Sequence, residues 1–110
     1  MQQKEIHLVN LDPVIDNEQS GIRPVVVISG DALNEHFKMA IVCPLSGSIK
    51  NYPGCPIIEP DSENGLTKPS EVLTFQVKSV AISRSIKKLG EINDKNLQEI
   101  IVGLNKILYY

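Results

Sequence analysis

Arg23-Pro24-Val25-Val26-Val27-Ile28-Ser29 is the stretch of sequence on which the fold depends. Its continuous run of β-branched residues predicts a strand that is buried on both faces. Pro24 has no N–H for a sheet ladder and therefore belongs at the beginning of that strand. The proline also holds Arg23 in an extended conformation, which presents a guanidinium suited to a phosphate. The same residues are equally compatible with a structural pair between Arg23 and a carboxylate.

Four more strands are predicted around this one. Residues 5–11 mix β-branched and apolar side chains and end at the turn signal Asp12-Pro13. Two further apolar runs predict strands at 39–45 and 55–59. Residues 71–82 alternate between apolar and polar side chains, which predicts one long, half-exposed strand. We expect its polar face to comprise Val72, Thr74, Gln76 and Lys78.

The period of the apolar residues changes after Gly90. Leucines and isoleucines recur at intervals of three and four from Leu97 to Leu108, which predicts an amphipathic helix with Asn93 or Asp94 as its N-cap. Gly103 costs such a helix about 1 kcal/mol, so we expect it to mark a close packing contact. The predicted fold is mainly β, of the α+β kind: one domain, residues 1–110, with a small, strongly curved antiparallel sheet closed by a C-terminal helix.

Size, composition and charge exclude several classes of protein. A chain of 110 residues with 42% hydrophobic and 22% charged residues fits one globular domain. Its apolar runs reach only about four residues, against ~18 for a membrane span, and no secretory signal precedes them, so we predict a cytoplasmic protein. A net charge of −2 argues against indiscriminate coating of nucleic acid. A basic strip between Leu73 and Gly90 nevertheless contains Lys78, Arg84, Lys87 and Lys88 without an acidic residue. Its charge indicates either a surface that attracts a polyanion or an edge strand that lysines keep soluble.

The nucleophiles and metal ligands of the chain form no recognisable motif. Cys43 and Cys55 are predicted to be free, partly buried thiols, and a thiol in an apolar strand is a poor nucleophile. His7 and His36 are too scattered to favour an acid/base pair or a zinc site, and we predict no metal or cofactor. The more informative feature is that Arg23 begins one strand while Ser46 ends another. We expect these two loop-mouth groups to face each other, although Ser46 is equally compatible with an ordinary turn hydroxyl.

Several blocks of the chain, taken together, resemble the signature of one protein family. The first half carries Asn10-Leu11-Asp12-Pro13, the block from Glu18 to Ser29, and Ala40-Ile41-Val42-Cys43-Pro44-Leu45-Ser46. The second half carries Asn64-Gly65-Leu66, Pro69-Ser70-Glu71-Val72-Leu73, Phe75-Gln76-Val77, Arg84 and Lys88-Leu89-Gly90-Glu91-Ile92. In order and spacing, over nearly the whole chain, these blocks resemble the MazF/PemK toxins of bacterial type II toxin–antitoxin pairs. Ser46 departs from the more frequent threonine but keeps the hydroxyl.

The resemblance implies a metal-independent endoribonuclease that cuts single-stranded RNA, usually mRNA, within a short recognition sequence. It also implies a homodimer, a cognate antitoxin as partner, and Arg23 and Ser46 as the catalytic pair. We expect the 2′-hydroxyl of the RNA to attack, giving 2′,3′-cyclic phosphate and 5′-hydroxyl ends. The expected RNA-binding residues are Glu18, Gln19, Ser20, Lys50, Asn51, Tyr52, Gln76, Lys78, Arg84 and Lys87, with Phe75 as a second candidate for base stacking.

Two other functions fit the same fold. One is a gyrase-poisoning toxin like the CcdB toxins, which resemble this family in fold. Those toxins depend on a C-terminal tryptophan, whereas this chain has no Trp and ends in Tyr109-Tyr110. The other is a regulator that binds nucleic acid without cutting it, against which the presence of both Arg23 and Ser46 argues.

Overall fold

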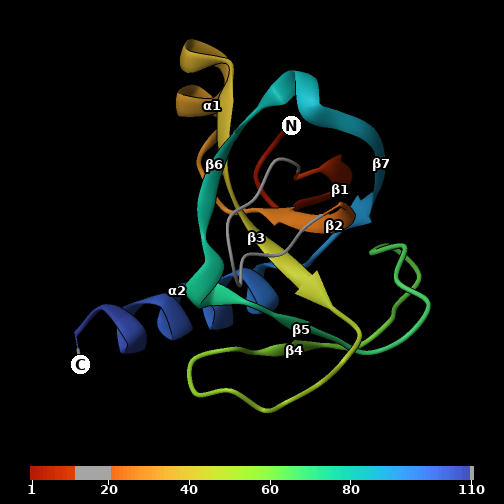
Figure 1. Ribbon diagram of the computed structural model, residues 1–110, viewed down its shortest axis with the longest axis vertical. Coiled ribbons are helices and arrows are strands. Elements are labelled where there is room, and N and C mark those ends of the chain that lie inside the picture. The colour runs from red at the N-terminus through yellow and green to blue at the C-terminus, as the bar shows by residue number, and fades with distance from the viewer. Residues whose placement is uncertain (12–20, 110) are drawn as a thin grey trace.

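The computed structural model describes residues 1–11 and 21–109, which form a curled antiparallel sheet that the C-terminal helix crosses (Figure 1). The elements in chain order are β1 (Glu5–Asn10), β2 (Ile22–Val27), α1 (Asp31–Phe37), β3 (Met39–Ser46), β4 (Ile57–Ile58), β5 (Ser70–Val72), η1 (Thr74–Gln76), β6 (Lys78–Ala81), η2 (Ile82–Arg84), β7 (Ser85–Glu91) and α2 (Asp94–Leu108). Within the described residues the strand order is β4-β5-β3-β2-β1-β7, and β6 also pairs with β3. The predicted fold class is confirmed.

Strand β2 lies at the middle of the sheet and is buried on both faces, as predicted. Val25, Val26 and Val27 have no exposed surface, and they contribute to two different cores because side chains alternate along a strand. Val26 packs in the cluster that includes Leu97 and Ile100 of α2. Val25 and Val27 pack in a second cluster on the inside of the curl. One β-branched run therefore holds the two layers of the molecule together.

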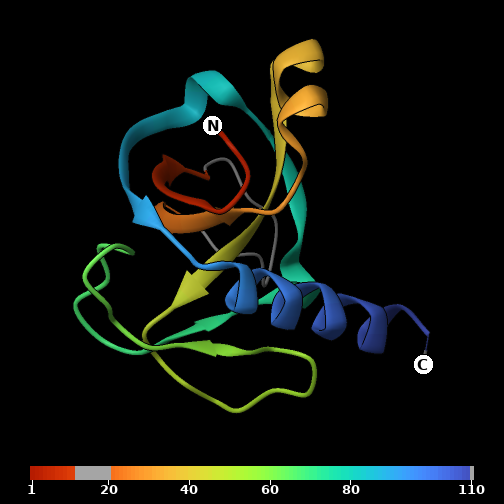
Figure 2. The same cartoon turned by 180° about the vertical axis from the view of Figure 1, so that it is seen from behind.

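Helix α2 crosses the sheet beside the segment that precedes β4 (Figure 2). Its N-cap is Asn93, whose side-chain oxygen accepts a hydrogen bond from the N–H of Asn96 at 2.7 Å. Gly103 faces the backbone of Gly54, and a Cβ atom on Gly103 would lie 2.1 Å from the Gly54 carbonyl oxygen. The N-cap and the close packing at Gly103 were both predicted from the sequence.

The second half of the sheet departs from the predicted strands. Residues 71–82 do not form one strand, because the short 3-10 helix η1 separates β5 from β6. Thr74 is fully buried there and its hydroxyl donates to the Gly54 carbonyl at 2.8 Å, so the chain turns inward where a strand would continue. The predicted polar face is therefore wrong, since Val72 is also buried.

Strand β7 was not predicted, nor was the short helix α1. Polar side chains such as Lys87 and Lys88 obscure the strand pattern of β7, which is formed by its antiparallel pairing with β1. The strand predicted at 55–59 is reduced to Ile57–Ile58. The predicted turn at Asp12-Pro13 lies outside the described residues.

Candidate active site

Arg23 and Ser46 line one cavity, with a volume of about 570 Å³, at the end of the sheet where β2 begins and β3 ends. The pairing of the two strands explains why. Their paired register ends with Val25 opposite Pro44, and Arg23 and Ser46 each lie two residues beyond this pair on their strands. Residues opposite each other in an antiparallel pair point to the same face. The expectation that these two groups face a common space therefore agrees with the geometry.

The charged residues that the structure describes in the lining of this cavity are all basic. They are Arg23 from β2, Lys50 from the segment after β3, and Lys68 from the segment before β5. No carboxylate is among the lining residues that the structure describes. The whole chain has a net charge of −2, whereas this cavity is a local region of positive charge. Such a region favours an anionic ligand.

Ser46 is half-buried, and its hydroxyl is tied to the next turn of the chain. Its Oγ accepts a hydrogen bond from the Ser48 N–H at 3.2 Å and lies 3.4 Å from the Ser48 carbonyl oxygen. The second of these contacts is long for an O–H donor. The hydroxyl is therefore positioned by the backbone while its proton remains available to a ligand in the cavity.

A buried carboxylate fixes the backbone of the segment that carries Lys50 and Tyr52 of the cavity lining. Glu71 in β5 has no exposed surface, and its two oxygens accept hydrogen bonds from the backbone N–H groups of Lys50, at 2.9 Å, and Tyr52, at 2.8 Å. Between these two residues Asn51 adopts a left-handed conformation with φ of 57°. Glu71 thus holds the backbone that carries two of the predicted RNA-binding side chains.

Two aromatic rings stand at the rim of the cavity. Tyr52 and Phe75 meet edge to face, with ring centroids 5.3 Å apart and an interplanar angle of 81°, and their residues are 43% and 50% exposed. Gln76, next to Phe75, also lines the cavity. Exposed ring faces beside hydrogen-bonding side chains are suited to stacking a base and bonding its edge.

The structure separates the sequence-predicted site residues into two groups. Lys50, Tyr52 and Gln76 line the same cavity as Arg23 and Ser46, and Asn51 lies in the same exposed segment. Lys78 and Arg84 line a different cavity, of about 290 Å³, where Arg84 also donates to the Asn10 carbonyl at 3.1 Å. Lys87 is exposed on β7, opposite Leu8 of β1. The residues Glu18, Gln19 and Ser20 lie outside the described part of the chain.

Sequence reasoning missed Lys68 and Ser48, which also line the cavity. Lys68 is the lone basic residue in the acidic segment between Glu59 and Glu71, and this isolation was the only sequence signal that it had. Its position next to the site follows from the fold of residues 59–69, which the fully buried Asn64 organises. The Asn64 side chain accepts from the Leu66 N–H at 3.0 Å and donates to the Glu59 carbonyl at 2.9 Å.

The cysteines and His7 are held in the fold by burial or by hydrogen bonds. Cys43 and Cys55 are free and buried, as predicted, and burial raises the pKa of the Cys43 thiol to about 12. His7 bridges two strands, because its Nδ1 lies 2.7 Å from Ser85 Oγ and its Nε2 lies 2.8 Å from Glu5 Oε1. Across residues 1–11 and 21–109, no three His, Cys, Asp or Glu side chains gather where they would hold a metal ion.

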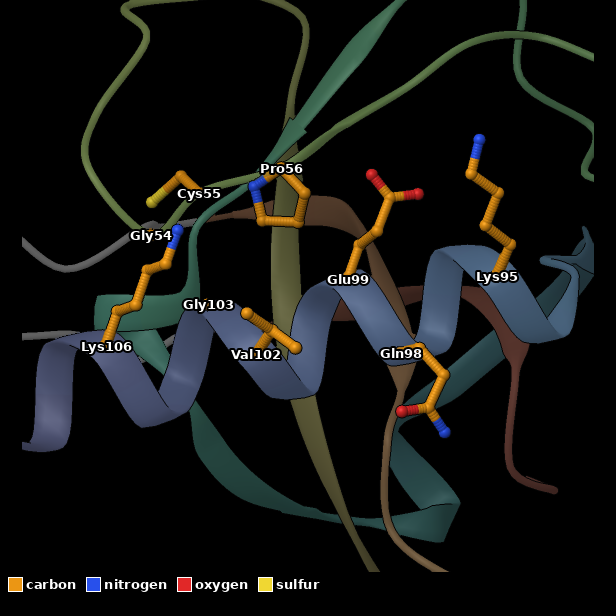
Figure 3. A pocket seen from close by; sticks show the side chains of 9 residues that line it. All are labelled: Gly54, Cys55, Pro56, Lys95, Gln98, Glu99, Val102, Gly103 and Lys106. Carbon is orange, nitrogen blue, oxygen red and sulfur yellow. The ribbon is translucent and has the colours of Figure 1, made fainter.

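A second groove runs between α2 and the segment Gly54-Cys55-Pro56, with a volume of about 410 Å³ (Figure 3). Lys95, Glu99 and Lys106 project from the helix beside it, with Val102 between them. This groove mixes both signs of charge and contains neither Arg23 nor Ser46. The concentrated positive charge, together with a hydroxyl and a guanidinium in one lining, distinguishes the first cavity as the candidate active site.

The fold and this site place the chain among small toxins with a curled sheet. The crystal structure of MazF (Form-I) from Deinococcus radiodurans is similar over 100% of this chain and 97% of that one, with a TM-score of 0.86 and 26% identity. An endoribonuclease in complex with its cognate antitoxin, from a mycobacterial species, shares the fold with a TM-score of 0.80 and 18% identity, over 98% of this chain and 94% of that one.

Sequence comparison narrows the class to a family. The model of the PemK-like, MazF-like toxins of type II toxin–antitoxin systems matches residues 2–108. The Endoribonuclease MazF of Staphylococcus saprophyticus is 33% identical over 101 residues, which cover 91% of this chain and 84% of that relative. The chain therefore belongs to the PemK/MazF family of toxins, as the sequence blocks around Arg23 and Ser46 predicted.

Among the described residues, neither helix has the length and apolar character needed to cross a membrane.

Proposed function

We propose that this protein is a sequence-specific endoribonuclease toxin that cleaves single-stranded RNA without a metal ion. Its main substrate is mRNA, and it acts in the cytoplasm. The observation that carries the proposal is that Arg23 and Ser46 line one cavity, and that the other charged residues described in its lining, Lys50 and Lys68, are also basic. Its family and the name of its staphylococcal relative support an endoribonuclease. The proposed cytoplasmic location follows from the substrate, because messenger RNA is translated in the cytoplasm.

The proposed reaction uses a nucleophile that the RNA itself supplies. The ribose 2′-oxygen attacks the adjacent phosphorus, the bond from phosphorus to the 5′-oxygen breaks, and the 2′-hydroxyl proton is lost to solvent or a nearby base. The products are a 2′,3′-cyclic phosphate and a 5′-hydroxyl end that has gained a proton. The protein has to align these atoms and stabilise the charge that develops on the phosphoryl oxygens.

Arg23 and Ser46 divide this work. The Arg23 guanidinium is permanently charged, so it neutralises charge on the non-bridging oxygens and on the departing 5′-oxygen as an electrostatic group. The Ser46 hydroxyl, held by the Ser48 N–H, donates to a non-bridging oxygen or orients the 2′-hydroxyl. Because Arg23 precedes Pro24, its backbone is restrained before substrate binds, which reduces the entropy lost on binding.

We assign the recognition of RNA bases to the residues at the rim of the cavity. Tyr52 and Phe75 offer ring faces for stacking, while Gln76 and Asn51 offer donors and acceptors for base edges. Lys50 supplies a further contact to the backbone phosphates. Glu18, Gln19 and Ser20 are further proposed RNA-binding residues, of which Glu18 and Gln19 are candidates for contacts to base edges.

The proposed partners are a cognate antitoxin and a second copy of the chain. Two of the similar structures are complexes of related toxins with their own antitoxins, from a mycobacterial species and from Deinococcus radiodurans. An acidic antitoxin segment would compete with RNA for the basic cavity. Sedimentation equilibrium of the purified chain tests the homodimer, and an antitoxin that blocks cleavage at equimolar concentration tests the competition.

The nuclease is tested by incubating the purified chain with a long single-stranded RNA in EDTA. We expect cuts at a limited set of sequences, and 5′ ends that ligate only after a kinase has phosphorylated them. Arg23→Ala is expected to abolish these cuts while its circular dichroism spectrum remains that of the wild type. A folded and fully active Arg23→Ala protein would refute the catalytic role.

The same assay separates the two other functions. Intact RNA together with inhibited DNA gyrase would indicate a gyrase poison. A shift of the RNA in a gel without any cleavage would indicate a regulator. Loss of all cleavage in EDTA, with recovery on adding Mg²⁺, would contradict the metal-independent mechanism alone.

A further inference from the structure

The ammonium of Lys68 lies over Gly47, the residue that follows Ser46. A Cβ atom on Gly47 would be 2.2 Å from Lys68 Cε and 2.6 Å from Lys68 Nζ. The end of the lysine side chain thus fills the space that any other residue at position 47 would need. The missing side chain of Gly47 thus leaves room for a positive charge in the cavity that Ser46 also lines.

Lys68 also lies where two cavities meet. The cavity that contains Ser46 and a neighbouring one of about 390 Å³ share Arg23, Gly47 and Lys68 in their linings. The first has hydrogen-bonding and aromatic groups at its rim, while the second is lined largely by apolar groups such as Pro24 and Leu89. An RNA strand that occupied both would pass its linking phosphate between Arg23 and Lys68.

The charge of Lys68 is not used by the fold. Within the part of the chain that the structure describes, every ion pair involves Lys4, His7 or Lys88, and no carboxylate oxygen lies within 4.0 Å of the Lys68 ammonium. Lys68 is exposed, and only its backbone carbonyl takes part in a described hydrogen bond, from the Ser70 hydroxyl at 3.2 Å. An unpaired cation beside a guanidinium is a favourable site for a phosphate group.

We propose that Lys68 contacts the phosphate that is cleaved, opposite Arg23, and so marks the boundary between the two nucleoside-sized cavities. This inference rests on the proposed ribonuclease function. Lys68 then acts as a catalytic residue that stabilises the phosphoryl oxygens, with Gly47 as the residue that admits it to the site.

The first test measures cleavage and binding separately. Cut sites are mapped on a long RNA, and binding is measured with an oligonucleotide that spans one cut site and carries 2′-deoxyribose at the cleaved nucleotide. We expect Lys68→Ala to slow single-turnover cleavage by about 10- to 100-fold. The plot of log binding constant against log salt should lose about 0.7 of its slope, the value for one phosphate contact to a single strand.

Two matched variants separate position from charge. Lys95→Ala removes an exposed lysine on α2, in the groove without Arg23 and Ser46, and we expect unchanged cleavage and an unchanged slope. Lys68→Arg keeps the charge and should keep the slope. Cleavage and a slope in Lys68→Ala that match those of the wild type would refute the inference.

Gly47 gives a second, independent test. Gly47→Ala displaces the Lys68 side chain, so we expect it to slow cleavage in the wild-type protein but to add little in the Lys68→Ala protein. Equal effects in both backgrounds would show that Gly47 does not act through Lys68. If Arg23→Ala abolishes cleavage while Lys68→Ala does not impair it, only this inference fails. If the wild type cuts no RNA, the proposed function fails with it.

Discussion

Ser46 contributes one hydroxyl to the cavity, and a conservative pair of variants isolates it. Ser46→Ala removes the hydroxyl and should lower the single-turnover rate of RNA cleavage by about 100-fold, comparable to the loss of one donor to a developing oxyanion. Ser46→Thr keeps the hydroxyl, as do family members with threonine here, and should retain most of the rate. The measurement is cleavage of a labelled RNA under enzyme excess, and wild-type activity in Ser46→Ala would remove Ser46 from the mechanism.

Glu71 shows how a buried residue that does not line the cavity shapes the site. In Glu71→Gln one of the two oxygens becomes an NH₂ group, so either the Lys50 or the Tyr52 N–H loses its acceptor. Because the carboxylate is fully buried, we expect the free energy of unfolding in urea to fall by about 1–3 kcal/mol.

The exposed Glu59 provides the control for Glu71. Glu59→Gln should change the free energy of unfolding by less than about 0.5 kcal/mol. Glu71→Gln should also weaken RNA binding, since it loosens the backbone of the cavity wall. Equal stability of the two variants would mean that the hydrogen bonds of Glu71 do not hold that backbone.

At the scale of elements, the contact between α2 and the segment before β4 depends on a glycine. Alanine at position 103 would improve helix propensity by about 1 kcal/mol. Its Cβ would however meet the backbone carbonyl oxygen of Gly54 at 2.1 Å, and backbone cannot rotate away as a side chain can. We expect Gly103→Ala to be less stable than the wild type by about 1–2 kcal/mol.

Asn105→Ala, at an exposed position on the same helix, is the matched control for Gly103→Ala. It should leave stability unchanged or raise it slightly, because alanine favours helix over asparagine. Thermal and urea unfolding measure both variants. A stabilised Gly103→Ala protein would show that α2 can move away from Gly54 at little cost.

The Glu5 carboxylate links β1 to β7 through an ion pair with Lys88. Burial raises the pKa of this carboxyl, but hydrogen bonds from His7, the Gln2 N–H and Lys88 outweigh burial and lower it from 4.5 to about 2. The unfolded chain therefore binds this proton more readily than the folded protein does. The stabilisation from Glu5 is present above pH 4.5 and is lost as the pH falls toward 2.

We expect this carboxyl to contribute on the order of 3 kcal/mol at neutral pH. The wild type should accordingly lose stability more steeply than Glu5→Gln between pH 5 and pH 2.5. Urea unfolding of both proteins at several pH values gives the comparison. Parallel curves would mean that the network of Glu5, His7 and Lys88 does not couple folding to this proton.

The elements that sequence patterns predict well here are those with one dominant period. The valines of β2 and the leucine and isoleucine spacing of α2 predict their own structure, and Arg23 and Ser46 follow because they end paired strands. Thr74 and Lys68 could not be placed in this way. The Thr74 hydroxyl is bonded to Gly54, twenty residues away in the chain, and the end of the Lys68 side chain occupies the space beside Gly47, twenty-one residues away. Such contacts are properties of the folded chain, which a local pattern does not contain.

For the whole molecule, the distribution of charge decides how RNA is held. The net charge is −2, yet Arg23, Lys50 and Lys68 surround one cavity. One residue of the basic strip predicted from the sequence forms ion pairs within the fold. Lys88 contacts Glu5 and Glu91, each at 3.2 Å, and these hydrogen bonds raise its pKa. Lys78 and Arg84 line a separate cavity.

These positions predict the salt dependence of binding. If only the three cations at the cavity contact phosphates, the slope of log binding constant against log salt should be about −2 for single-stranded RNA. A fourfold rise in salt would then weaken binding by about 20-fold. Phosphate contacts from Lys78, Arg84 and Lys87 as well would bring the slope to about −4.

The triple variant Lys78→Met, Arg84→Met, Lys87→Met distinguishes these two footprints. We expect it to bind the 2′-deoxy oligonucleotide of cut-site length with the slope of the wild type, because its substitutions lie away from the cavity that contains Ser46. On RNA several times longer, its slope should be less negative than that of the wild type if the strand continues across β6 and β7. A reduced slope on the short oligonucleotide would extend the active-site groove to these strands, whereas identical slopes on both lengths would assign the basic strip to the solubility of the sheet edge.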